Sequence, residues 1–150
     1  MAQKWKLLRV FQVIIAVLIL IQLGDFCLNC FGYLFFNGAL GLENPANLFY
    51  IKSIPLLLVS LIILVLAQNQ TSFSKKLILV LIFYTIHIFS TLYIVITYYN
   101  YYDTQMTLQH IRADFGIHLI VDIIILTMLL YMISTSRKLL KVTNLAHRDY

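Results

Sequence analysis

The stretch Leu77–Tyr98, LILVLIFYTIHIFSTLYIVITY, contains 22 residues and no Asp, Glu, Lys or Arg. A helix needs about 20 predominantly apolar residues to cross a hydrocarbon core of roughly 30 Å. Three other stretches reach that length by themselves or with their flanks: Val10–Leu23, Ile54–Ala67 and Phe115–Ile133. The chain of 150 residues is therefore predicted to cross a membrane four times.

The composition supports this prediction. The chain is 61% hydrophobic and 11% charged, whereas soluble domains average roughly 45–50% apolar and about 25% charged residues. Backbone polar groups in lipid must be satisfied internally, so membrane spans are helices or strands of a closed barrel. Barrel strands alternate apolar and polar residues, and these stretches do not. We therefore predict an all-α integral membrane protein, with four transmembrane helices in an antiparallel bundle.

The predicted bundle forms a single domain over residues 1–150. Its spans cover roughly 7–27, 48–67, 77–98 and 115–133, and the apolar outer loop 28–47 is expected to lie partly at the membrane interface. Asn44–Pro45 predicts a helix start, because Asn is a good N-cap and Pro fits the first helical position. Asp103–Thr104 could cap the last helix in the same way, and this helix is expected to continue into Arg137–Lys141.

Positive charge indicates how the chain is threaded. Four crossings place nine of the eleven basic residues on one side, namely Lys4, Lys6, Arg9, Lys75, Lys76, Arg137, Lys138, Lys141 and Arg148. Basic residues concentrate on the cytoplasmic side of membrane proteins, so both termini are predicted to be cytoplasmic. We interpret the basic tail as a topology signal that also contacts anionic lipid, not as a nucleic-acid site. The Ile-, Leu-, Lys-, Asn- and Tyr-rich composition favours a bacterial cytoplasmic membrane.

Ionisable residues recur every four positions before and within the last span. His110, Asp114, His118 and Asp122 fall on one helix face and form a polar stripe that descends into the bilayer. His87 lies near the middle of the third span. Counted from the outer ends, His87 and Asp122 differ in depth by about 6 Å at 1.5 Å per residue, so they could face each other.

An intramembrane carboxylate costs about 2.5–3.5 kcal/mol on insertion scales and is normally turned inward and paired. Three interpretations of Asp122 follow. The stripe could carry protons or divalent cations such as zinc, since His and carboxylates suit both. Asp122 could instead anchor another subunit. It could also hold the bundle together by bonding His87, Thr85 or Tyr84. The sequence leaves any metal unknown.

Cys27 and Cys30 form a CxxC motif at the outer end of the first span. On an outer face such a pair can form a disulfide or exchange thiols. In topology and in this spacing the chain resembles the quinone-linked disulfide-generating membrane oxidases. Those enzymes relay electrons through a second cysteine pair, and this chain contains two cysteines in all. The chain therefore lacks the essential relay of that family and is not assigned to it. An outer-face thiol-disulfide oxidoreductase is kept as an alternative, beside a structural disulfide, lipid-facing thiols or an acylation site.

No nucleotide-binding, zinc-protease or serine-hydrolase motif is present, and the sequence implies no cofactor. We expect a small non-enzymatic membrane protein that acts through protein contacts, either as an accessory subunit of a membrane complex or as an immunity-like protein. The partner would be another membrane protein or a second copy of the chain. The alternative is a small permease coupled to protons or divalent cations through the Asp/His stripe.

Overall fold

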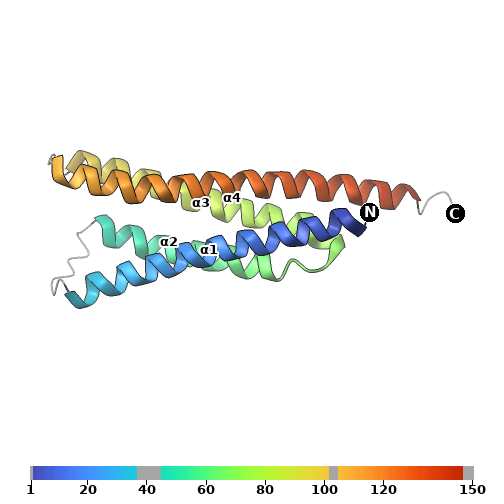
Figure 1. Ribbon diagram of the computed structural model, residues 1–150, viewed down its shortest axis with the longest axis horizontal. Helices are drawn as coiled ribbons and strands as arrows, with labels where there is room; N and C mark the ends of the chain where they lie inside the picture. Colours follow the sequence, from blue (N-terminus) through green and yellow to red (C-terminus); the bar gives the residue numbers. More distant parts are fainter. Residues whose placement is uncertain (1, 37–44, 102–104, 147–150) are drawn as a thin grey trace.

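The computed structural model describes residues 2–36, 45–101 and 105–146 (Figure 1). Side chains at positions 29–52, 70–71, 94–95, 97–115 and 143–150 lie outside the described part. Four helices account for the described residues except a short turn at 66–69. They are α1 (Ala2–Phe36), α2 (Pro45–Val65), α3 (Gln70–Tyr101) and α4 (Gln105–Ala146).

Three of these helices contain a segment long and apolar enough to cross a bilayer. The segments are Ala2–Leu28, Ser72–Tyr93 and Gly116–Val142. The described apolar part of α2 is shorter and covers Ser53–Val65. Large apolar side chains such as Val13 and Phe89 are more than 60% exposed on the outside of the bundle. Such a surface suits lipid, and these features together indicate a membrane protein.

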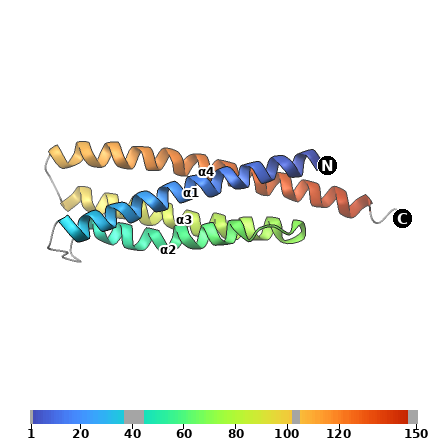
Figure 2. The same ribbon diagram turned by 60° about the horizontal axis from the view of Figure 1, so that its bottom comes forward.

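The helices form a ring in which α1 packs against α2 and α4, and α3 packs against the same two helices. Between α1 and α4 the Phe11 ring lies 5.5 Å from the Tyr131 ring, and Asp25 contacts His118. From the first contact to the second, the residue number rises by 14 in α1 and falls by 13 in α4. These two helices therefore run in opposite directions. Figures 1 and 2 show that α1 begins where α4 ends, which we call the terminal end of the bundle. The opposite end is the distal end.

Buried positions in all four helices are separated alternately by three and four residues. In α1 they are Leu8, Gln12, Ile15, Ile19, Gln22 and Phe26. In α2 they are Ser53, Leu57, Ser60, Leu64 and Ala67, the last in the turn that follows the helix. The corresponding series run from Phe73 through Thr91 in α3 and from Asp122 through Leu139 in α4. A repeat of 3.5 residues is the pattern of left-handed bundles with crossing angles of about 20°.

The end of α2 is capped by side chains of its neighbours. Arg9 Nη1 donates to the Ala67 carbonyl at 2.7 Å, and Gln12 Nε2 donates to the Leu64 carbonyl at 2.6 Å. Lys76 Nζ donates to the Leu66 carbonyl at 2.6 Å. The last carbonyls of a helix have no partner within the helix and carry partial negative charge. These contacts therefore attach α1 and α3 to the terminal end of α2.

The helix bounds agree with several sequence predictions and differ from one expectation. α2 begins at Pro45, and α4 extends through Arg137–Lys141 to Ala146, both as predicted. α1 continues to Phe36, past the expected end of the first span near Cys27. The sequence from Phe26 to Phe36 contains no proline, and a single glycine, Gly32, costs a helix only about 1 kcal/mol.

Replacing Gln12 with Leu should lower the free energy of unfolding by about 1–2 kcal/mol, because the hydrogen bonds to Leu64 and Arg9 are lost. Unfolding of the purified protein by SDS titration in mixed micelles measures this change. Thr127→Val is the matched control, since the Thr127 hydroxyl is exposed and bonds its own helix at Ile123. Equal stability of the two variants would contradict a capping role for Gln12.

Candidate functional site: a buried polar cluster

Three polar side chains from three helices meet inside the bundle. Asp122 of α4 accepts hydrogen bonds at Oδ1 from Gln22 Nε2 of α1 at 2.8 Å and from the Tyr84 hydroxyl of α3 at 2.6 Å. The Tyr84 hydroxyl also lies 2.9 Å from Gln22 Oε1. All three side chains are buried, and Asp122 is 1% exposed. We call Gln22, Tyr84 and Asp122 the polar cluster.

The chemistry of the cluster suits a buried carboxylate. A tyrosine hydroxyl has one proton, which it can donate to Asp122 or share with Gln22. The Tyr84 hydroxyl lies closer to Asp122 Oδ1 than to Gln22 Oε1, which favours donation to Asp122. Two donors on one oxygen offset part of the 2.5–3.5 kcal/mol that an aspartate costs in the membrane interior. The cluster therefore links α1, α3 and α4 through Asp122, the buried side chain that costs most free energy to place in a membrane.

The heptad pattern explains how the cluster is positioned. Gln22 follows Leu8 and Ile15 at intervals of seven residues, so the three side chains share one face of α1. Tyr84 follows Leu77 in α3 by the same interval. Each cluster residue thus occupies a core position that an apolar residue fills in the neighbouring heptads.

His87 lies beside the polar cluster on the same face of α3. It is 1% exposed, and its ring is 5.6 Å from the Tyr84 ring and 6.0 Å from the Phe26 ring. Asp122 and His118 are both near enough to act electrostatically on the imidazole. Among the described residues His87 Nδ1 has no hydrogen-bond partner. A buried ionisable group with one unused nitrogen is therefore available next to Asp122.

His118 forms an ion-pair contact toward the distal end. Its Nε2 lies 3.1 Å from Asp25 Oδ2 of α1, and both side chains are partly exposed. The Phe26 ring lies 5.1 Å from His118 and separates this pair from His87. His118 precedes Asp122 by one helical turn, and Asp25 follows Gln22 by nearly one turn. The His118–Asp25 and Asp122–Gln22 contacts therefore lie one turn apart along the interface between α1 and α4.

The structure places the predicted stripe residues as follows. His118 and Asp122 both face α1, each with its own partner, and His87 lies near them on α3. The side chains of His110 and Asp114 lie outside the described residues. No group of three His, Cys, Asp or Glu side chains that could hold a metal is found in the described part of the chain.

Cys27 is half-buried in α1 and forms no disulfide within the described residues. The side chain of Cys30 is outside them, so the disulfide or redox pair remains a prediction.

Sequence reasoning named Tyr84 only as one possible partner of Asp122 and did not single out Gln22. The signal was present in the sequence. Gln22 interrupts the run Val13–Leu23, VIIAVLILIQL, near its outer end. An amide in such a run needs a partner inside the bundle, and Asp122 is at a matching depth in an antiparallel helix.

No protein-family profile matches the chain, and neither the curated proteins nor the solved structures compared with it give a significant match.

Removing the Tyr84 hydroxyl by Tyr84→Phe should lower the free energy of unfolding by about 1–2 kcal/mol, because Asp122 loses its shorter hydrogen bond. Tyr131→Phe is the matched control, since Tyr131 is 47% exposed and its described contact is the ring packing with Phe11. A double-mutant cycle of Tyr84→Phe with Asp122→Asn should give a coupling energy above about 0.5 kcal/mol. Additive effects would show that the two side chains act independently.

Proposed function

We propose that this chain is a small multi-pass membrane protein that acts through contacts with other membrane proteins, without catalysis of its own. An accessory subunit of a membrane complex and an immunity-like protein that shields against a membrane-active partner both fit this role. The observation that carries the proposal is that buried polar side chains form hydrogen bonds that hold the helices together. The polar cluster connects helices, and Gln12 caps α2.

The core between the polar cluster and the terminal end gives further support. Its fully buried side chains are mostly apolar and come from all four helices: Leu8, Ile15, Leu57, Leu64, Leu77, Val80, Ile125, Leu129 and Met132. Gln12, Ser60 and Ser136 are also buried there. Gln12 caps α2, Ser136 donates to the Ile133 carbonyl of its own helix at 3.0 Å, and Ser60 Oγ has no hydrogen-bond partner among the described residues. A transport path needs polar groups along its whole length. The described side chains favour a closed interior.

The proposed topology is an antiparallel bundle of four spans with both termini in the cytoplasm. In this topology α2 crosses the membrane as well as the three longer apolar helices. Exposed cations gather at the terminal end, on α1, α3 and α4: Lys4, Lys6, Lys75, Arg137, Lys138 and Lys141. Asp25 lies toward the distal end, beside His118. The positive-inside rule then supports a cytoplasmic position for the terminal end.

A photo-crosslinking amino acid tests the contact proposal in living cells. At the lipid-facing positions Phe89 and Ile123 it should give adducts with one defined membrane protein, whereas at the buried position Ile125 it should not. The same protein should remain bound during purification in mild detergent. Adducts with a second copy of this chain would identify a homo-oligomer, and adducts with lipid alone at every exposed position would remove the basis of the proposal.

A proton-coupled permease is the second candidate, and one observation favours it. Asp25, His118, His87 and Asp122 form a series of ionisable groups from the distal region into the core, and His87 Nδ1 has no partner among the described residues. Protons could therefore reach Asp122 from the distal side. The apolar core described above stands between Asp122 and the terminal end, so this candidate also requires that core to open.

Reconstitution into vesicles that contain a pH-sensitive dye separates the two candidates. For the contact proposal, we expect the wild-type protein and Asp122→Asn to give the same proton leak as empty vesicles. Wild-type flux that is lost in Asp122→Asn, with Asp25→Asn also impaired, would favour the permease. Zinc uptake measured in the same vesicles tests the divalent-cation form of that alternative.

A further inference from the structure

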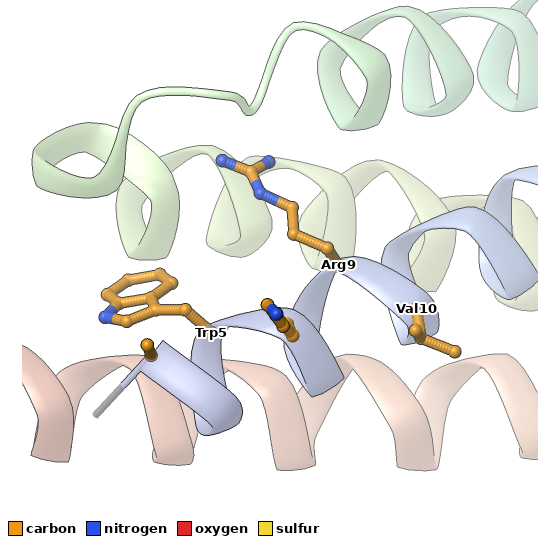
Figure 3. A pocket seen from close by; sticks show the side chains of 5 residues that line it. Trp5, Arg9 and Val10 are labelled. Atoms are coloured by element: carbon orange, nitrogen blue, oxygen red, sulfur yellow. The ribbon is translucent and has the colours of Figure 1, made fainter.

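The first turns of α1 border an open groove at the terminal end of the bundle. It has a volume of about 560 Å³ and is lined by Ala2, Trp5, Lys6, Arg9 and Val10. Their spacing of three and four residues places them along one face of the helix. Figure 3 shows Trp5 and Arg9 extending from α1 toward the turn between α2 and α3, while Val10 points away from that turn.

The two cations of the groove have different roles. Arg9 is held in place, because its guanidinium donates to the carbonyls of Ala67 and Gln68 and lies 5.1 Å from the centre of the Phe73 ring. Lys6 is exposed, and no described residue gives it a hydrogen bond or ion pair. Its ammonium group is therefore available to an anion, and Arg9 supplies a second, fixed positive charge to the lining of the same groove.

An apolar track continues from the groove along α1. Val10, Val13, Val17 and Leu20 are all exposed, between 48% and 62%, and their spacing keeps them on one side of the helix. From Val10 to Leu20 the helix rises about 15 Å at 1.5 Å per residue. This is half of a hydrocarbon core of roughly 30 Å, the depth that the acyl chains of one leaflet occupy.

We propose that this groove binds an anionic phospholipid of the leaflet at the terminal end. The phosphate lies against Lys6 and the charge of Arg9, the Trp5 indole lies at the level of the headgroup, and the acyl chains follow Val10 to Leu20. Tryptophan is enriched at this depth of the bilayer, and basic pockets beside transmembrane helices suit anionic headgroups. This site is independent of the proposed partner contacts and of the state of the polar cluster.

The lining favours a lipid over a soluble phosphate compound. Trp5, Val10 and Ala2 supply apolar surface that a free anion would leave unused, and the cations stand at the start of the track. An amphiphile with a negative head matches both parts. A zwitterionic lipid has the same chains but no net negative charge, so the groove should prefer phosphatidylglycerol to phosphatidylcholine.

Titration of the purified full-length protein with phosphatidylglycerol in mixed micelles tests this assignment, with the melting temperature as readout. Lys6→Gln should raise the lipid concentration needed for half of the stabilisation about fivefold, which corresponds to about 1 kcal/mol for one cation near a membrane surface. Lys141→Gln is the matched control, because Lys141 is an exposed lysine of α4 outside the groove. Val10→Trp should fill the groove and weaken binding while the charge stays unchanged.

The assignment holds if phosphatidylglycerol stabilises the wild type and Lys141→Gln more than phosphatidylcholine does, and both groove variants respond less. Equal loss in Lys6→Gln and Lys141→Gln would indicate diffuse surface attraction and overturn it. No preference for phosphatidylglycerol would overturn it as well. Glycerol phosphate that protects as well as the lipid would assign the groove to a soluble anion instead. Melting temperatures without lipid establish that each variant is folded.

Discussion

The burial of one carboxylate constrains the whole bundle. Asp122 lies where lipid or apolar side chains would otherwise surround it, and Gln22 and Tyr84 both donate hydrogen bonds to one of its carboxyl oxygens. Those donors belong to two other helices, α1 and α3. The need of Asp122 for hydrogen-bond donors therefore determines which faces of three helices turn inward. Each helix has other rotations that would bury a similar apolar area, and the hydrogen bonds to Asp122 favour one of them.

The rotation selected at Asp122 extends along the bundle through the heptad pattern. Gln12, Gln22, Ser60, Tyr84, His87 and Ser136 all occupy buried positions of this repeat. In lipid, apolar side chains gain little by turning inward, because the acyl chains are equally apolar. Polar and small residues therefore specify the interior face, and leucine and isoleucine fill what remains. The cap on α2 and the polar cluster are two fixed points of this interior, near opposite ends of the described core.

The two ends of the molecule differ in chemistry. The terminal end combines exposed cations, a capped helix end and the groove beside Trp5, all of which suit a charged headgroup region. The half nearer the distal end holds the ionisable groups Asp25, His118 and His87 close to the polar cluster. The apolar core between the cluster and the terminal end separates these regions. This separation supports our proposal that the chain acts through protein contacts.

The sequence by itself determined the all-helical character, the number of helices, the start of α2 at Pro45 and the continuation of α4 into Arg137–Lys141, because hydrophobic length and capping residues are local properties. It also identified Asp122 and His87 as interior groups from the cost of charge in lipid. Only the tertiary structure decided that Gln22 and Tyr84 bond Asp122, that His118 pairs with Asp25, and that Arg9 caps α2. Polar residues mark the interior face of each helix, but they do not show which residues of different helices meet. These pairings depend on contacts between residues about 40 to 100 positions apart in the chain.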